Sequence, residues 1–408
     1  MSDFDKPYMS PIDMIAKLKS KGLIITNDNT ATELLEELGY NRLINGYKRP
    51  AIANVDDTES FNSDTTIEDL YTLYTIDFQF RELLLTNILH IENHLETLLG
   101  NLIAQKYNVN SHRKHDQNNP RPDIPSYLSR RYYAKSKIAP KILQHIEHNI
   151  LQKTLDNPTR YYRENKNHVP PWILTQNMPL GTLIKYYKIQ KNDIKDAVVS
   201  SILPVSNNNL IADKLLFETA LSLLKAFRNA AAHSTPIYLK KVKLGNYFSK
   251  NKLIEYLGTA IFSQGSDPQV ELFGRNDLYG AMLSMVLLSN NISRRSIIIN
   301  KLKNLDNSYK SSDYSRMYLT YLQSANLPID YVMRLTSATK HIINLKGNNN
   351  LFSGDVAQSR RVYYLADTKT YHLTNSCPRI GYTTKEIYLS AEQIVIQQGF
   401  KKCKTCSK

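Results

Sequence analysis

Three residues in the middle of the chain combine the groups needed to cut RNA without a metal ion. Arg228, Asn229 and His233 occur in the run RNAAAH. Histidine titrates near neutrality and suits proton transfer, whereas arginine is a permanently charged donor that matches phosphate oxygens. Asparagine can orient the imidazole ring or bind a phosphate oxygen. The residue types are thus compatible with proton transfer by His233 and with phosphate binding by Arg228 and Asn229.

One helix is expected to position this triplet. Apolar residues recur every three or four positions over 210–232, which predicts a helix there. Ser234-Thr235-Pro236 predicts that the helix breaks just after His233. Within a helix, Asn229 and His233 are four residues apart and share one face. The alternative interpretation is a polar helix end with no catalytic role.

A second group of reactive side chains lies at the C-terminal end. His372 and Cys377 precede Cys403 and Cys406, and these are all the cysteines of the chain. Tetrahedral zinc takes this ligand set, and a tail with so few core residues needs such a cross-link to fold. Four protein ligands close the coordination sphere, so we expect a structural Zn²⁺ rather than a catalytic one. The alternative is a loose tail with free thiols.

Charge is divided unevenly along the chain. Residues 1–105 contain 8 Lys/Arg and 17 Asp/Glu, whereas residues 106–408 carry a net charge of +24 within an overall +15. A long basic surface favours a polyanionic partner, with RNA ahead of a membrane because no basic amphipathic helix stands out. The alternative is a merely basic cytosolic protein.

Residues 106–168 interleave 13 basic residues with tyrosines, a combination that suits RNA because cations pair with phosphates and bases stack on rings. A Tyr-rich helical insertion with a solvated face is the alternative. The candidate RNA-binding residues are Arg113, Lys114, Arg130, Arg131, Tyr132, Tyr133, Lys135, Arg160, Tyr161 and Arg163.

Periodicity and turn signals predict a mainly α protein. The expected helices cover residues 8–24, Thr30–Leu38, a long core helix from Ile67, Leu180–Ile189, 210–232 and several segments within 250–345. Residues 54–66 are expected to be a loop. The tail changes character: residues 362–373 predict a hairpin, followed by a short helix at about Ala391–Gln398.

The run from Arg228 to His233 resembles the Rx4–6H signature of the HEPN superfamily, helical proteins many of which are metal-independent ribonucleases that pair two motifs across a dimer. The wider chain resembles the Abi-like family of abortive-infection proteins, of the AbiD/AbiF type. The residues that carry this resemblance are Lys6-Pro7, the run 19–23, 39–43, Gly46-Tyr47, Arg81, Glu92, Pro171-Trp172, Gly181 and 227–236.

This resemblance implies a toxin that halts growth after phage infection by cleaving RNA, and that an antidote restrains beforehand. It implies Arg228, Asn229 and His233 as the active site of a homodimer. Glu92 either orients His233 or satisfies a polar pocket, and we favour the second role. The net charge of +24 favours a small structured RNA as the antidote.

The tail resembles a small zinc module appended to various nucleases. The matching residues are Tyr371, His372, Cys377, Ala391, Gly399, Cys403 and Cys406. Lys402 stands where that module has proline. The expected fold is therefore a HEPN-like helical bundle with helical additions and a small α+β zinc-binding tail.

These signals divide the chain into four expected parts. They are an N-terminal helical segment (1–53), a HEPN-like core with a basic insertion at 106–168 (65–248), a helical extension (249–345) and a zinc-binding module (355–408). No apolar stretch is long enough for a membrane span, so we expect a cytoplasmic protein.

Two other functions stay open from the residues. A non-catalytic RNA-binding or scaffold protein of a defence ribonucleoprotein would also use the basic surface. A DNA-binding regulator would use the zinc tail, but no recognition helix is recognisable.

Overall fold

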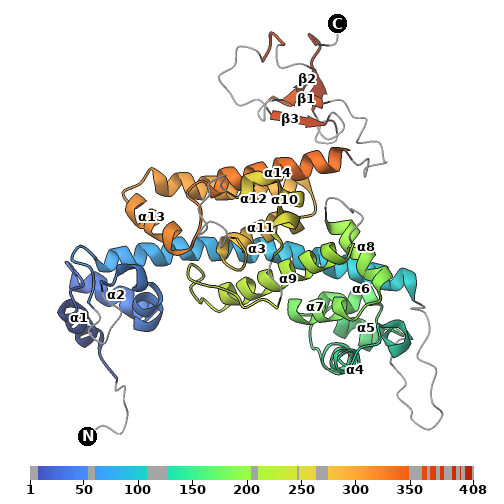
Figure 1. Ribbon diagram of the computed structural model, residues 1–408, viewed down its shortest axis with the longest axis horizontal. Helices are drawn as coiled ribbons and strands as arrows, with labels where there is room; N and C mark the ends of the chain where they lie inside the picture. The colour runs from blue at the N-terminus through green and yellow to red at the C-terminus, as the bar shows by residue number, and fades with distance from the viewer. Residues whose placement is uncertain are drawn as a thin grey trace. The chain divides into compact units, whose positions relative to one another are not determined.

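The computed structural model describes two compact units, formed by residues 1–343 and 344–408. The described residues are 8–53, 60–107, 126–203, 210–245, 248–262, 274–348, 361–364, 368–373, 377–380, 388–391, 396 and 400–406. Helices dominate the first unit, whereas the described strands belong to the second (Figure 1). The expectation of a mainly α protein with a small sheet in its tail is confirmed.

The α-helices are α1 (Pro11–Ser20), α2 (Asp28–Leu38), α3 (Ile67–Lys106), α4 (Ala139–His145), α5 (Thr159–Asn165), α6 (Pro171–Leu174), α7 (Leu180–Lys188), α8 (Asn192–Ile202), α9 (Leu210–Ala232), α10 (Lys250–Leu257), α11 (Leu278–Leu288), α12 (Ile292–Lys310), α13 (Ser315–Ser324) and α14 (Tyr331–Asn348). Short π-helices are η1 (Asn41–Asn45) and η5 (Ile146–Gln152). Short 3₁₀ helices are η2 (Arg49–Ala51), η3 (Ser126–Leu128), η4 (Arg130–Tyr132), η6 (Thr175–Asn177) and η7 (Thr259–Ile261).

The long core helix expected from Ile67 is α3, which has 40 residues. It starts with a capping box, in which the Thr66 side chain accepts from the Asp69 N–H and the Asp69 side chain accepts from the Thr66 N–H. Helices α6, α8, α9, α11 and α13 all pack against it. A helix this long is stable because apolar side chains along its length are covered by several neighbours.

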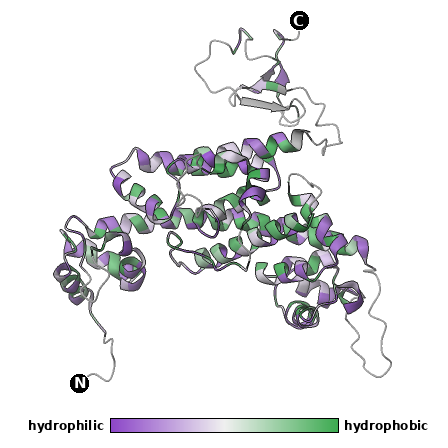
Figure 2. Cartoon of the chain, viewed as in Figure 1, coloured by the Kyte–Doolittle hydropathy of each residue, from purple (hydrophilic) through white to green (hydrophobic). Residues whose placement is uncertain are grey.

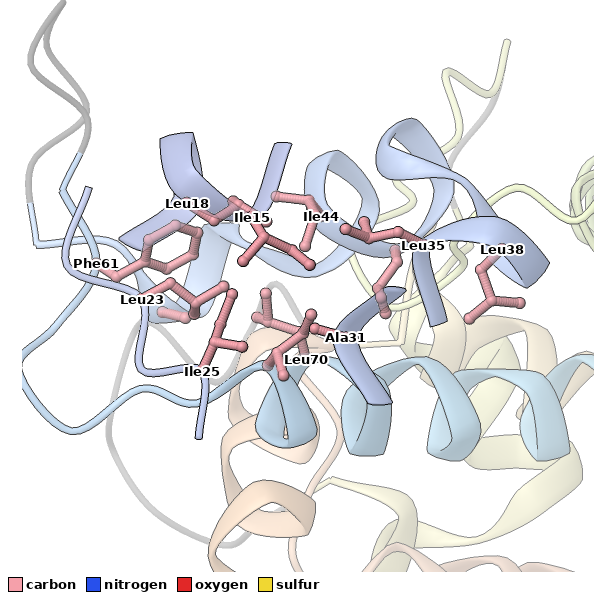
Figure 3. Close-up of a cluster of buried hydrophobic side chains, with 13 residues drawn as sticks. Ile15, Leu18, Leu23, Ile25, Ala31, Leu35, Leu38, Ile44, Phe61 and Leu70 are labelled. Carbon is pink, nitrogen blue, oxygen red and sulfur yellow. The ribbon is translucent and has the colours of Figure 1, made fainter. Parts of the chain in front are cut away.

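The N-terminal helices form a small core of their own against the start of α3. Figure 3 shows Ile15 and Leu18 of α1 and Leu35 of α2 in one apolar cluster with Leu70 of α3. Backbone bridges from Ile24 to Thr66 and from Ile52 to Phe61 tie the connecting segments to this cluster. The acidic N-terminal part is therefore packed onto the same long helix that reaches the candidate site.

Helices α9 and α11 pack closely beside α3. Every residue of α11 is buried, and Figure 2 shows its hydrophobic residues in the middle of the helical unit. The longest apolar run of the sequence is thus a core helix of 11 residues. No helix in the described part of the chain is long and apolar enough to cross a membrane.

The C-terminal unit contains a four-stranded sheet of order β3-β1-β2-β4. Its strands are β1 (Arg361–Tyr364), β2 (Thr370–His372), β3 (Tyr388–Ala391) and β4 (Lys401–Lys402). The antiparallel pair of β1 and β2 confirms the expected hairpin. Strand β3 runs to Ala391, so the predicted helix does not begin at that residue, and most of its remaining length lies outside the described residues.

Candidate functional site

The helix that carries the triplet ends as expected. Helix α9 stops at Ala232, and the Ser234 and Thr235 N–H groups donate to the carbonyls of Ala231 and Ala230. These two bonds form a Schellman motif that requires a left-handed residue after the C-cap, and Ser234 has φ of 54°. His233 is the C-cap residue and is exposed, as is Asn229 one turn earlier. Both side chains are therefore accessible to a bound molecule.

Asp77 of α3 fixes the segment that follows His233. Its buried carboxylate accepts hydrogen bonds from the backbone N–H groups of Ile237 and Tyr238, both at 3.1 Å. Three side chains from elsewhere in the helical unit also reach it, namely the Tyr47 hydroxyl at 2.9 Å, the Tyr321 hydroxyl at 2.9 Å and Arg81 Nε at 3.1 Å. Through this carboxylate, α3 thus connects the segment after α9 to Tyr47, which follows η1, and to Tyr321 of α13.

Gly46 and Tyr47, which belong to the residues that carry the family resemblance, contact the same segment. A Cβ added at Gly46 would lie 3.2 Å from Pro236 Cγ, so that position leaves little room for a side chain. The Tyr238 hydroxyl donates to the Gly46 carbonyl at 3.1 Å, and the rings of Tyr47 and Tyr238 stack at 5.5 Å. Residues far apart in the sequence therefore converge on the turn that ends the candidate site.

Glu92 of α3 contacts Arg228, the first residue of the triplet. Its Oε2 atom lies 3.8 Å from Arg228 Nη2, and its carboxylate also accepts the N–H of Leu180 at the start of α7. Glu92 is 5% exposed, whereas the Arg228 side chain is 32% exposed. Burial raises the pKa of Glu92, and the positive charge of Arg228 works against that rise. The charged contact partner of Glu92 is therefore Arg228 and not His233.

A second carboxyl group lies one turn further along α3. Glu96 is buried, and burial together with the charge of Glu92 raises its pKa to about 8. Glu96 is therefore mainly uncharged at neutral pH, and Glu92 is the carboxylate that contacts Arg228.

Helices α6 and α7 are held close to α3 and α9 by small residues. A Cβ on Gly100 of α3 would lie 2.7 Å from Trp172 Cα, so α6 rests directly on this glycine. A Cβ on Gly181 would lie 3.0 Å from Lys225 Cε, so the Lys225 side chain passes over the start of α7. These approaches bring the first residues of α7 to Glu92 and Arg228.

Several candidate RNA-binding residues make contacts within the protein. Arg113 and Lys114 lie outside the described residues. Arg130 donates to the carbonyls of Ala134 and Ser136, and Arg163 donates to that of Leu151. Tyr133 is 2% exposed, so its ring faces are covered by protein. In this conformation, these three side chains support the basic insertion itself.

The other candidates in this region are more accessible. Arg131, Lys135, Arg160 and Tyr161 are exposed. Arg131 lies over the ring of Tyr132 at 4.8 Å, and Tyr132 stacks on Tyr107 at 4.4 Å. Arg160 pairs with the exposed Glu164 at 3.1 Å, a surface ion pair that contributes little to stability.

The C-terminal unit brings all four predicted metal ligands together. The ligand atoms of His372, Cys377, Cys403 and Cys406 lie within 4.8 Å of one another. His372 Nδ1 is 3.3 Å from Cys377 Sγ and 3.6 Å from Cys406 Sγ. Tetrahedral zinc with its usual bond lengths separates nitrogen and sulfur ligands by roughly 3.5 Å. The donor set and its spacing therefore fit a zinc ion bound through Nδ1 and three thiolates.

Two buried carboxyl groups of α3 near the site were not predicted from the sequence. Asp77 and Glu96 occupy the inward side of α3, where apolar residues are the rule. Charged residues at apolar positions of the helical pattern are a signal that could have identified both. Their partners could not be identified, because those partners lie on distant segments.

Comparison with protein families gives a match. A family model described as Abi-like protein matches residues 33–239, just over half of the chain. The matched region runs from α2 to the segment that Asp77 holds, and it includes Glu92, Arg228 and His233. No curated protein and no solved structure matches the chain. The chain belongs to the Abi-like protein family.

Proposed function

We propose that this protein is a phage-defence toxin of the abortive-infection kind, and that it acts as a metal-independent endoribonuclease. Membership of the Abi-like family supports the defence role. The observation that carries the catalytic part is the placement of Arg228, Asn229 and His233. The triplet lies at an accessible helix end, and buried carboxylates hold the structure on both sides of it.

The chemistry follows from the three side chains. His233 takes the proton of the 2′-hydroxyl or protonates the leaving oxygen, and Arg228 with Asn229 binds the scissile phosphate. Attack by the 2′-hydroxyl leaves a 2′,3′-cyclic phosphate on one product. DNA lacks this hydroxyl and would not be cleaved.

A homodimer would supply two triplets to one cleft. Between Asp77 and Glu92, α3 exposes the apolar side chains of Phe78 and Leu89, which are 41% and 40% accessible. Helix α9 packs against α3 over the same stretch. A second copy is our proposed occupant of this surface. Leu89→Arg is expected to shift the protein to a monomer in analytical ultracentrifugation and to lower cleavage.

RNA contact is assigned to Arg131, Lys135, Arg160 and Tyr161, because these candidates are accessible. A small structured RNA is the proposed antidote, since residues 106–408 carry a net charge of +24. Sequencing nucleic acid that co-purifies with the protein tests this. A discrete RNA that suppresses cleavage is expected, whereas inhibition by a neighbouring protein would contradict it.

The zinc ion would act as a structural cross-link in the C-terminal unit. Its proposed ligands are His372, Cys377, Cys403 and Cys406, which leave no coordination position for substrate. Zinc would supply folding free energy to a unit whose described apolar clusters are small.

The test of catalysis is a comparison of the parent protein with His233→Ala on single-stranded RNA, with Mg²⁺ omitted. The parent is expected to cleave and to inhibit growth, and the variant to do neither. RNA binding without cleavage in the parent would favour the non-catalytic scaffold instead.

A further inference from the structure

We propose that Glu92 is a positioning residue that fixes the direction in which the Arg228 guanidinium meets a phosphate group. This inference rests on the proposed function, because it assumes that Arg228 binds the scissile phosphate. It assigns to Glu92 a role in the reaction without placing it among the groups that touch substrate.

Glu92 is the buried partner of this pair, and Arg228 is the partly exposed one. Glu92 is 5% exposed and its Oε2 atom is buried, so the carboxylate cannot reach a bound RNA. The Arg228 side chain is 32% exposed, so part of it is open to solvent. Glu92 can therefore act on a substrate only through the arginine.

The contact orients Arg228 without using up its donors. At 3.8 Å, the distance from Glu92 Oε2 to Arg228 Nη2 is too long for a hydrogen bond, so the attraction is coulombic. Arg228 Nε forms no hydrogen bond with any described residue. Because Nε is buried, a phosphate would meet the accessible remainder of the Arg228 side chain.

Two positive groups meet the Glu92 carboxylate, and a third lies near one of them. The start of α7 contributes the Leu180 N–H and the positive end of its helix dipole. Helix α9 contributes Arg228, and Lys225 lies over Gly181, next to Leu180. Without the negative charge of Glu92, these groups repel one another, and we expect Arg228 to turn away from α7 into solvent.

Glu96 supplies the matched control on the same helix. It is one turn from Glu92, and its pKa of about 8 keeps it mainly uncharged at pH 7. The charged group that faces Glu92 is Arg228 of α9, while α6 has no titratable side chain. Ionisation of Glu96 would add a second negative charge one turn from Glu92 and so change the electrostatic field at Arg228.

The experiment compares Glu92→Gln with Glu96→Gln in RNA cleavage. Glutamine keeps the size of the side chain and can still accept the Leu180 N–H, but it carries no charge. We expect Glu92→Gln to lower kcat by about 10- to 100-fold, the range for a misplaced catalytic group, with KM and Tm near those of the parent. Equal kcat in Glu92→Gln and the parent would overturn the inference.

The pH profile provides the second readout. Glu96→Gln is expected to match the parent at pH 7, because Glu96 is already mainly neutral there. The parent should lose activity as pH rises through about 8, and Glu96→Gln should not show this part of the decline. Equal losses at pH 7 in the two variants would indicate a purely structural role and would overturn the inference.

A titration that needs no activity separates this inference from the proposed function. Arg228 lowers the pKa of Glu92, so Arg228→Gln should raise it, as followed by ¹³C NMR of labelled glutamate side chains. If the parent cleaves no RNA, the proposed function fails, yet the pairing is still supported by this rise. An unchanged pKa of Glu92 would refute the pairing even in an active enzyme.

Discussion

The helical unit and the C-terminal unit hold their reactive side chains in opposite ways. In the helical unit, a large apolar core positions α3 and α9, and the triplet lies at an exposed end of that framework. In the C-terminal unit, the described core contains few residues, and two of the metal-ligating cysteines belong to one of its two small clusters. Our proposal is therefore that the site depends on the fold in the first unit, whereas the fold depends on the metal site in the second.

This difference predicts how each unit responds to the loss of its functional residues. Removing a ligand should unfold the C-terminal unit, because metal binding and folding are one process in such small domains. Removing a residue of the triplet should leave the helical unit folded, because exposed side chains contribute little to stability. The predictions below test this contrast.

The largest expected effect is on the C-terminal unit. Cys403→Ala leaves three ligands, and structural zinc contributes about 10–16 kcal/mol to the folding of comparable peptides. Metal analysis should show about one zinc per parent chain and none in the variant. Hydrogen exchange should show lost protection in 361–406 alone.

Lys404→Ala is the matched control, since Lys404 is exposed and lies between the two ligands Cys403 and Cys406. It should keep its zinc. A Cys403→Ala protein that holds zinc and keeps its exchange protection would show that the unit does not depend on this site.

A smaller but still large effect is expected at Asp77, the one buried carboxylate that orders the segment after α9. Asp77→Asn removes a charge that accepts from two backbone N–H groups and faces Arg81. Breaking a buried ion pair by changing one partner costs about 3–5 kcal/mol, which urea unfolding can measure.

Asp64→Asn is the control, because Asp64 is 71% exposed in its ion pair with Arg316. Its loss should cost less than about 1 kcal/mol. Equal urea midpoints for the two variants would show that the buried contacts of Asp77 do not stabilise the helical unit.

The smallest of these effects is expected where α6 lies on α3. Gly100→Ala places a Cβ 2.7 Å from Trp172 Cα, so the helices must separate slightly. Overpacking of this kind costs about 1–3 kcal/mol. Trp172 is the only tryptophan of the chain, and its fluorescence should report the shift directly. Gly245→Ala, where a Cβ meets nothing within 4 Å, should change neither fluorescence nor stability.

Local patterns predicted the elements that carry the candidate sites. Helix α9 ends at Ala232 as expected, since its periodicity and the following Ser-Thr-Pro are local signals. The β1–β2 hairpin and the four clustered ligands also follow from short-range spacing. The domain boundaries and the RNA-binding residues stay predictions.

The elements that the sequence did not predict depend on distant contacts. Helix α8 was missed: its Val198, Val199 and Ile202 favour strands locally, and its packing on α3 and α9 stabilises it as a helix. Strand β4 is two residues long and exists through its pairing with β2. The convergence of Tyr47, Tyr321 and Ile237 on Asp77 spans much of the helical unit, so no local pattern contains it.

One measurement tests the central claim most directly. Parent protein and His233→Ala are incubated with single-stranded RNA, and product ends and thermal stability are recorded for both. We expect the parent to release 2′,3′-cyclic phosphate ends and the variant to lose cleavage by at least about 100-fold at an unchanged melting temperature. Full cleavage by a folded His233→Ala protein would contradict the assignment of the α9 triplet as the active site.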